Sequence, residues 1–266
     1  MNVVLIQMAV TDGENGNDRL KKAESYLEQI ENAPEKPDLV IFPELWKCGF
    51  QNFAGYRDGA EILQGQTWQF MSRWAKRLHC YIHSGSFVEK QVQGAEDTVF
   101  YNTSVLFDRQ GREKGIYRKI HLFGFESMEQ KILTAGQSVT EVETEFGRTG
   151  MATCYDLRFP EQFRVQEDAV PELFLITAAW PAARLEHWRL FNRVRAVENQ
   201  SYVISCNAAG EQCGVAEAGH SMVVDPLGNI LAEASGQETI LWCELDPKQS
   251  AGWREQFPAL KDRKRF

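Results

Sequence analysis

Strand-like and helix-like segments alternate along the chain, and this alternation limits the possible folds more than any other feature of the sequence. Short apolar runs predict strands at residues 3–7, 39–42, 81–87, 103–107, 150–154, 174–176, 202–206, 222–224 and 240–244. Amphipathic segments predict helices through apolar residues at helical spacing: Leu20, Ala23, Leu27 and Ile30; Met71, Trp74, Ala75 and Leu78; and Leu190, Val194 and Val197. A further helix-like segment follows Pro160. The pattern is typical of an α/β fold.

Length and composition agree with one folded unit. The chain has 266 residues, of which 43% are hydrophobic and 25% are charged, close to the averages for folded globular domains. It contains no internal repeat, low-complexity tract or linker rich in Pro, Gly and Ser, so we expect a single domain over residues 1–266. The segment Asp225-Pro226-Leu227-Gly228 predicts a turn between two of the late strands.

Charge, hydropathy and cysteine content argue against several classes of protein. The formal net charge of −8 gives no general attraction for phosphate backbones, so we expect no nucleic-acid partner. The longest apolar stretch, around residues 173–183, is far shorter than the roughly 18–20 residues of a membrane span. Residues 1–7 lack the basic start of a signal peptide, so a cytoplasmic location is expected. The six cysteines form no Cys-x-x-Cys pair, which favours free thiols.

Cys154 stands at the junction of an expected strand and a sharp turn, before Tyr155-Asp156-Leu157-Arg158-Phe159-Pro160-Glu161. A strand that leads into a turn and a helix presents its last side chain at the carboxyl edge of the sheet, near helix-terminal N–H groups. Those groups and a nearby cation would favour the nucleophilic thiolate. The alternative is a buried, inert cysteine. Arg158 is expected to be structural and to pair with Asp156 or Glu161.

Two further residues have side chains suited to catalysis. Glu44 follows an apolar run in Phe42-Pro43-Glu44, where burial would suit it to general acid–base chemistry, although a solvent-facing carboxylate is the simpler interpretation. Lys119 lies in Tyr117-Arg118-Lys119-Ile120-His121, a mixture of aromatic and basic residues that usually marks a solvated surface. Taken singly, neither residue predicts a function.

The order, spacing and neighbours of these residues are distinctive in combination. Lys119 lies 75 residues after Glu44, and Cys154 lies 35 residues after Lys119. With Phe-Pro-Glu, Tyr-Arg-Lys-Ile-His-Leu-Phe and Cys-Tyr-Asp-Leu-Arg-Phe-Pro-Glu around them, the arrangement resembles the nitrilase superfamily of carbon–nitrogen hydrolases. The resemblance covers nearly the whole chain and includes residues 101–104, 179–181, 187–188, 195–200, 219–221 and 225–228. Within the superfamily, the chain is most similar to the amidase branch that contains ω-amidase and related Nit proteins.

The resemblance implies a catalytic triad of Glu44, Lys119 and Cys154. A second family glutamate corresponds to Glu129, which precedes a Thr-Ala-Gly sequence that anchors the match. Glu126 lies only three residues away and is the alternative. Glu129 is expected to position Lys119 or the substrate, with an exposed carboxylate at a helix start as the alternative.

The family chemistry implies hydrolysis of an amide through a covalent intermediate. The Cys154 thiolate would attack the carboxamide carbon, and Lys119 with the backbone N–H of Tyr155 would stabilise the oxyanion. Glu44 would give a proton to the leaving ammonia and then activate the water that hydrolyses the thioester. No metal or other cofactor is expected, because the five histidines have neither His-x-x-x-His nor His-Glu-x-x-His spacing and no glycine-rich nucleotide-binding signature is present.

The resemblance to ω-amidases implies a small ω-amide of a 2-oxo dicarboxylic acid as substrate, such as 2-oxoglutaramate or 2-oxosuccinamate. The far carboxylate of such a molecule needs a local cationic or N–H-rich pocket. Arg184 is the candidate for this role, with a surface arginine as the alternative. Phe123 and Trp180 are candidates for the pocket lining, although large aromatic residues also serve as plain core.

Other interpretations stay open. The same chemistry could act on another acyl group, in deaminated glutathione, a methylthio keto-acid amide or an N-carbamoyl compound; nitrile hydrolysis is disfavoured because the motifs match the amidase branch. A non-catalytic binding member of the fold is disfavoured because it would have no reason to keep three catalytic groups in register. A thiol redox protein is disfavoured because the chain has no Cys-x-x-Cys motif.

The resemblance also implies a particular architecture. This is a four-layer αββα sandwich, with two sheets face to face, helices outside and the active site at one end of the sheets. A homodimer is implied as well. The aromatic-rich helix expected over residues 185–199, with Trp188 and Phe191, is a candidate interface element, and packing in the core explains it equally well.

Overall fold

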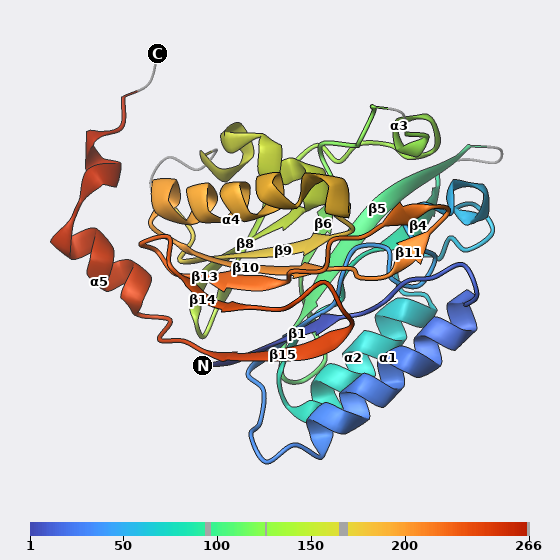
Figure 1. Ribbon diagram of the computed structural model, residues 1–266, viewed down its shortest axis with the longest axis horizontal. Coiled ribbons are helices and arrows are strands. Elements are labelled where there is room, and N and C mark those ends of the chain that lie inside the picture. The colour runs from blue at the N-terminus through green and yellow to red at the C-terminus, as the bar shows by residue number, and fades with distance from the viewer. Residues whose placement is uncertain (94–96, 126, 165–169, 265–266) are drawn as a thin grey trace.

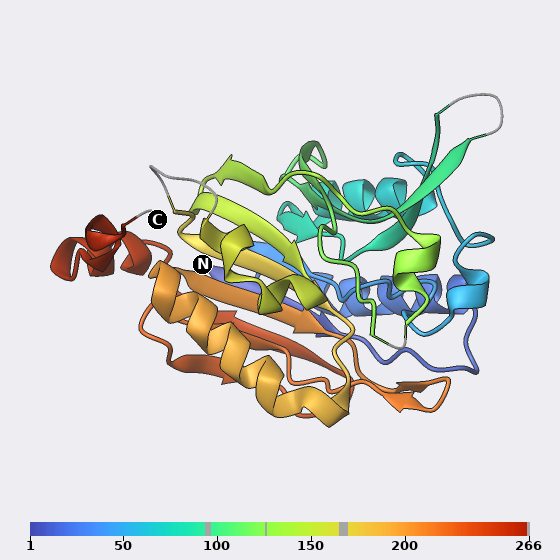
Figure 2. The same ribbon diagram turned by 90° about the horizontal axis from the view of Figure 1, so that it is seen from above.

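Two β-sheets lie face to face, and helices cover their outer faces (Figures 1 and 2). The computed structural model describes residues 1–93, 97–125, 127–164 and 170–264. Helices α1 (Gly16–Glu31) and α2 (Gln66–Leu78) pack on the first sheet, and α4 (Leu185–Asn199) packs on the second. The four-layer αββα sandwich expected from the sequence is confirmed.

The first sheet combines parallel strands at its centre with antiparallel strands at its edges. Its spatial order is β15 (Thr239–Glu244), β1 (Asn2–Gln7), β2 (Leu39–Ile41), β3 (Tyr81–His83), β5 (Thr98–Phe107) and β4 (Phe87–Val92), with β6 (Glu113–Arg118) also paired to β5. Strands β1, β2 and β3 are parallel, whereas β15 and β5 pair with them antiparallel. The parallel strands are joined through α1 and α2, which explains why apolar runs and amphipathic segments alternate in the sequence.

The second sheet has the same mixed character. Its order is β14 (Ile230–Glu233), β13 (Met222–Val224), β10 (Tyr202–Asn207), β9 (Leu173–Ala178), β8 (Gly147–Thr153) and β7 (Thr140–Thr144). Strands β8, β9 and β10 are parallel, and α4 connects β9 to β10. The remaining regular elements are a small hairpin of β11 (Glu211–Gln212) and β12 (Val215–Ala216), helices α3 (Glu129–Ile132) and α5 (Gln249–Gln256), and 3₁₀ turns at Phe53–Gly55, Cys154–Arg158, Pro160–Arg164, Ala182–Arg184 and Ala259–Asp262.

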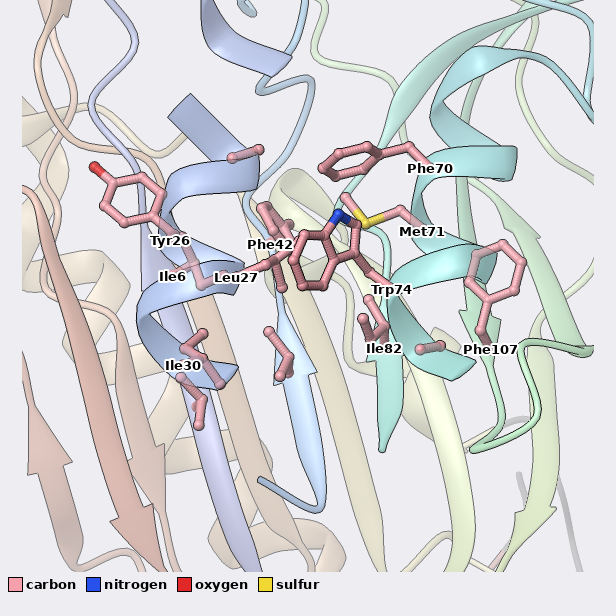
Figure 3. Packing of buried hydrophobic residues seen from close by; sticks show 14 of the residues in the cluster. Ile6, Tyr26, Leu27, Ile30, Phe42, Phe70, Met71, Trp74, Ile82 and Phe107 are labelled. Carbon is pink, nitrogen blue, oxygen red and sulfur yellow. The ribbon is translucent and has the colours of Figure 1, made fainter. Parts of the chain in front are cut away.

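The side-chain alternation of β1 shows how the layers are held together. Val3 and Leu5 belong to the apolar cluster between the two sheets, whereas Val4 and Ile6 belong to the cluster under α1 and α2. Figure 3 shows this outer cluster, in which Trp74 of α2 lies among side chains of the sheet and of α1. Because both faces of β1 are buried, its sequence is a continuous apolar run rather than an alternating one.

Helix α4 buries a different face from the one with the regular apolar spacing. Its buried residues are Trp188, Asn192, Arg195, Ala196 and Asn199. Leu190, Val194 and Val197 are 56%, 38% and 51% exposed on the opposite side. The helix is therefore confirmed, but its apolar stripe does not face the protein core.

Two expected segments differ from the structure. Residues 81–87 form two strands, β3 and β4, because the chain bends at Gly85, which has a φ of +65°. A Cβ atom at Gly85 would lie 2.1 Å from the Pro43 carbonyl oxygen, so only glycine fits this close approach. The segment after Pro160 is a short 3₁₀ turn, and residues 165–169 lie outside the described residues.

In the described part of the chain, no helix is long and apolar enough to cross a membrane.

Candidate active site

Three charged side chains from distant segments meet in a buried cluster. The Lys119 Nζ donates hydrogen bonds to Glu44 Oε1 at 2.8 Å and to Glu129 Oε1 and Oε2 at 3.0 and 3.1 Å. Glu44 is 1% exposed, and Lys119 and Glu129 are fully buried. The structure thus brings together three residues that the sequence singled out. Glu126, the alternative to Glu129, lies outside the described residues.

Glu44 is fixed at the point where the two sheets meet. It follows β2, and its backbone N–H donates to the Ala178 carbonyl at the end of β9 at 3.2 Å. Its Oε2 accepts a hydrogen bond from the Ala179 N–H at 2.9 Å. The next residue, Leu45, has a φ of 47°, and its N–H is bound by the Ser86 hydroxyl at 3.0 Å. Both sheets therefore determine the position of this carboxylate.

Asn102 on β5 connects the two glutamates and has no assigned role in the sequence analysis. Its Nδ2 donates to Glu44 Oε1 at 2.8 Å and to Glu129 Oε1 at 3.2 Å, and its carbonyl accepts the Lys119 N–H at 2.9 Å. Asn102 is fully buried. Asn102 belongs to the motif Tyr101-Asn102-Thr103-Ser104, which is the sequence signal that points to it. Its partners become visible only in the folded chain.

The charges of the cluster determine its protonation. Burial alone would lower the pKa of Lys119, but the charges of Glu129 and Glu44 outweigh burial and raise that pKa above its ordinary value. Burial raises the pKa of Glu129, an effect that the charge of Lys119 opposes. Lys119 is therefore a permanent cation that two carboxylates share.

Cys154 occupies a strained corner between β8 and a 3₁₀ turn. Its φ is 48°, in the left-handed region that side-chain-bearing residues rarely adopt. Asp156, fully buried, holds this corner: its carboxylate accepts hydrogen bonds from the Thr153 N–H at 2.8 Å, the Tyr117 hydroxyl at 2.6 Å and the His121 N–H at 3.0 Å. The expected strand–turn geometry is present, and it is supported by a network around one carboxylate.

The protonation of Cys154 differs from the sequence-based expectation of a resting thiolate. Burial raises the pKa of the thiol well above its ordinary value, and the charge of Glu44 raises it further; Lys119 acts in the opposite direction but does not compensate. The physical reason is that the thiol is deeply buried and lies close to the charge of Glu44, and these two effects on its pKa outweigh the charge of Lys119. The sulfur therefore rests as a thiol and needs a base, and Glu44 is a carboxylate close enough to influence it.

A cavity of about 250 Å³ opens beside Cys154. Its wall contains Phe50, Gln51, Phe123, Phe125, Cys154, Tyr155, Arg158, Ala179, Trp180, Pro181, Ala183, Arg184 and Val215. Four residues that the sequence proposed for the site, namely Phe123, Tyr155, Trp180 and Arg184, thus line the same space as the thiol. Sequence reasoning missed Phe50 and Gln51, because nothing in their local pattern distinguishes them from an ordinary loop.

Arg158 also lines this cavity, which corrects the expected pairing with Asp156 or Glu161. Its guanidinium lies over the rings of Trp180 and Phe191, 4.9 and 5.2 Å from their centroids. Among the described residues, no carboxylate lies within ion-pair distance of Arg158 or Arg184. Burial lowers the pKa of Arg158, and the neighbouring charge of Arg184 lowers it further. The cavity therefore holds two uncompensated cations, which an anionic ligand would neutralise.

The described residues contain no group of three or more His, Cys, Asp or Glu side chains arranged to hold a metal ion. The chemistry open to the site is that of a buried nucleophile, a carboxylate base and a fixed cation around one small cavity. This combination suits attack on a carbonyl carbon with stabilisation of the resulting oxyanion.

Known proteins are similar to this chain in sequence and in fold over most of its length. A sequence model of the carbon-nitrogen hydrolase family matches residues 3–255. The 2-oxoglutaramate amidase of Paenarthrobacter nicotinovorans is 37% identical over 99% of this chain and 90% of its own length, and omega-amidase NIT3 of Saccharomyces cerevisiae is 32% identical over 92% and 87%. A CN-hydrolase superfamily protein from Xanthomonas campestris has a crystal structure with a TM-score of 0.88, at 30% identity over 100% of this chain and 98% of that chain. The chain therefore belongs to the carbon-nitrogen hydrolase family, which acts on C–N bonds such as those of amides.

Proposed function

We propose that this protein is an ω-amidase that hydrolyses the small ω-amide of a 2-oxo dicarboxylic acid to a carboxylate and ammonia. The observation that carries the proposal is the cavity in which the Cys154 thiol adjoins two uncompensated arginines, Arg158 and Arg184. A thiol with a nearby base can form an acyl intermediate, and the arginines suit a substrate with a distal carboxylate. Relatives named 2-oxoglutaramate amidase and omega-amidase support this substrate class.

The first half-reaction forms the thioester. Glu44 takes the proton of the Cys154 thiol as the sulfur attacks the carboxamide carbon, and the carbonyl π electrons move to oxygen. The oxyanion receives hydrogen bonds from Lys119 and from the backbone N–H of Tyr155, which stands in the first turn of a 3₁₀ segment, where N–H groups lack partners inside the turn. The C–N bond then breaks, the protonated Glu44 gives its proton to the nitrogen, and ammonia leaves.

The second half-reaction reverses these proton transfers with water. Glu44 takes a proton from water as its oxygen attacks the thioester carbon, and the same two donors stabilise the second oxyanion. The C–S bond breaks, the carboxylic acid forms, and the sulfur regains the proton held by Glu44. Glu129 positions Lys119, because its two carboxylate oxygens both bind Nζ.

The size and polarity of the cavity favour a short acyl chain. About 250 Å³ is below the usual range of roughly 300–1,000 Å³ for pockets that hold drug-sized ligands. Phe123 and Trp180 supply apolar walls for the methylene groups, and the arginines bind the far carboxylate. Deaminated glutathione is a larger substrate and fits this volume less well, whereas a methylthio keto-acid amide or an N-carbamoyl compound is the second candidate.

We further propose that the chain acts as one catalytic domain and as a homodimer. The apolar stripe of α4, formed by Leu190, Val194 and Val197, continues onto the exposed Leu227, Ile230 and Leu231. A Cβ atom at Gly228 would lie 2.6 Å from Val197 Cγ2, so the turn between β13 and β14 touches the helix. A continuous apolar surface of this kind suits a second copy of the chain.

The six free cysteines support the cytoplasmic location expected from the sequence.

Ammonia release from a panel of amides tests the proposed function. The panel contains 2-oxoglutaramate, 2-oxosuccinamate, a methylthio keto-acid amide, deaminated glutathione and an N-carbamoyl compound. We expect the highest kcat/KM for the first two substrates, no turnover by the folded Cys154→Ala protein, and an acyl adduct on Cys154 after acid quenching and mass spectrometry. Turnover that persists in Cys154→Ala would refute the mechanism. Absence of both ammonia and adduct with every amide would indicate a non-catalytic binding protein.

A further inference from the structure

Glu217 is a buried carboxyl group beside the cavity that the proposed mechanism does not use. It is 6% exposed, and an antiparallel bridge pairs it with Pro181, a residue of the cavity wall. The following N–H, of Ala218, donates to the Trp180 carbonyl at 2.8 Å. The backbone therefore fixes Glu217 against the segment that leads to Arg184.

The carboxyl group of Glu217 has few hydrogen-bond partners for its depth. Gln51 Nε2, from a residue that lines the cavity, donates to Oε1 at 3.5 Å. Oε2 is buried and has no hydrogen-bond partner among the described residues. A carboxylate in such a place would lack the donors that usually stabilise its charge, whereas a neutral carboxyl is far less costly to bury.

The charged groups around Glu217 act in opposite directions. Burial raises the pKa of Glu217 to about 8; the hydrogen bond from Gln51 lowers it, the charge of Glu44 raises it and the charge of Arg184 lowers it. Tyr56, a buried phenol, is a further titratable neighbour. Arg184 is thus close enough to interact with Glu217, although no ion pair joins the two.

We propose that Glu217 is a positioning residue that controls anion binding in the cavity: its neutral carboxyl leaves Arg184 available to the carboxylate of the substrate, and its ionised form competes with the substrate for Arg184. The inference rests on the proposed function in taking an anionic amide as substrate. Binding of such an amide and ionisation of Glu217 are then mutually antagonistic, so anion binding takes up a proton at alkaline pH.

The pH dependence of KM tests this role. For an anionic amide, KM of the unmodified enzyme should rise about tenfold between pH 7 and pH 9, because about one-tenth of a group with a pKa near 8 remains protonated one unit higher. In Glu217→Gln, which is always neutral, KM should stay constant over this range. A neutral amide such as butyramide should show no rise with either protein, and kcat should follow the same pH profile in both.

A matched variant and two contrary outcomes complete this experiment. Glu211→Gln changes an exposed glutamate on the same hairpin and should keep the alkaline rise in KM. A KM for the anionic amide that stays flat in the unmodified enzyme would overturn the proposal. So would a rise of equal size in Glu217→Gln.

Calorimetry gives a second readout that needs no turnover and no Glu217 variant. A small dicarboxylate, the class of product expected here, is titrated into the Cys154→Ala protein at pH 8 in two buffers of different ionisation enthalpy. We expect uptake of about half a proton per bound anion, since about half of the Glu217 groups are ionised at that pH. Binding without proton uptake would refute the role of Glu217. Proton-linked binding in a protein that hydrolyses no amide would instead leave this role standing and refute the proposed function.

Discussion

The carboxylate of Glu44 has three hydrogen-bond donors around it, from Asn102, Lys119 and the backbone of Ala179. These donors come from both sheets, so the carboxylate has little freedom to rotate away from the thiol. At the same time, a buried Cys154 thiol needs a base before it can attack. In the proposed mechanism a single carboxylate serves both half-reactions, so the chemistry should depend strongly on this one residue.

Replacement of Glu44 by Gln should lower kcat/KM for the amide substrate about 10²- to 10⁴-fold, the usual contribution of a general acid–base group. The fold should remain, because Gln has the same shape and Glu129 still binds Lys119 through both carboxylate oxygens. Ammonia release and thermal unfolding measure the two effects. Glu141→Gln, which changes a partly buried glutamate on β7 paired with Arg148, is the control and should keep normal activity. If Glu44→Gln retains more than a tenth of the activity, the assigned role is wrong.

We expect the buried His83 on β3 to lower the free energy of unfolding measurably in acid. It is fully buried, neither ring nitrogen has a hydrogen-bond partner among the described residues, and burial lowers its pKa to about 3. Burial keeps His83 neutral in the folded protein, whereas the same histidine takes up a proton in the unfolded chain below its pKa of about 6.5. Full stability is therefore present above pH 6.5, and stability is lost as the pH falls toward 3. Between pH 7.5 and pH 5.0, the loss from this single group is about 2 kcal/mol.

The His83→Leu variant tests this assignment by urea unfolding at pH 7.5 and pH 5.0. The free energy of unfolding should fall by about 2 kcal/mol less in the variant than in the unmodified protein. His187→Gln, which changes an exposed histidine on α4, should leave the pH dependence intact. An equal acid loss in His83→Leu would assign the effect to other groups.

At the scale of elements, the ends of strands hold the site in register. Asp156 joins the corner after β8 to Tyr117 of β6 and to the segment that follows Lys119. Near the same end of β6, the Gly136 N–H donates to the Lys119 carbonyl at 2.8 Å. These contacts link strands of both sheets, so we expect a change in one loop to be transmitted to Lys119.

Gly136→Ala should disturb the site through the backbone. The new Cβ would lie 2.0 Å from the Arg118 carbonyl oxygen, so the end of β6 must move and take Lys119 with it. We expect kcat/KM to fall at least about tenfold and stability to fall by about 1–3 kcal/mol, as for an overpacked site. At Gly252 in α5, a Cβ atom would have no described residue within 4 Å, so Gly252→Ala should be harmless or slightly stabilising. Normal activity in Gly136→Ala would show that the loop does not position Lys119.

At the scale of the whole molecule, the helices on the outer faces of the two sheets differ in how they bury their apolar side chains. Helices α1 and α2 bury their apolar faces on the first sheet, and α4 covers the second (Figures 1 and 2). Helix α4 packs through Trp188 and Ala196 together with polar residues, and it leaves a separate apolar stripe outside. An amphipathic helix normally buries its apolar side. The exception on α4 is the physical basis for the proposed dimer.

Val194→Glu should therefore convert a dimer into a monomer. The charge would lie at the centre of the stripe between Leu190 and Val197, where burial against a second copy is costly. Sedimentation velocity should show twice the monomer mass for the unmodified protein and the monomer mass for the variant. Val92→Glu changes a 67% exposed residue on β4 and should stay dimeric. A monomeric unmodified protein, or a Val194→Glu dimer, would contradict the proposed interface.

Much of this architecture could be predicted from local patterns. The continuous apolar run of β1 reflects burial on both faces, and the spacing of Ala23, Leu27 and Ile30 reflects the one buried face of α1. The turn at residues 225–228 follows from the preference of glycine for positive φ, which is +87° at Gly228. Such features depend on neighbours along the chain, so a single sequence is enough to predict them.

By itself, the sequence determined the alternation of strands and helices and marked Glu44, Lys119, Glu129 and Cys154 as candidates. Only the tertiary structure decided which charged and polar groups lie close enough to interact. It joined Asn102 to two glutamates, placed Arg158 at the cavity wall and left one oxygen of Glu217 without a hydrogen-bond partner among the described residues. The physical reason is that backbone geometry and side-chain periodicity are local, whereas burial and Coulomb interactions depend on distances between residues far apart in the chain.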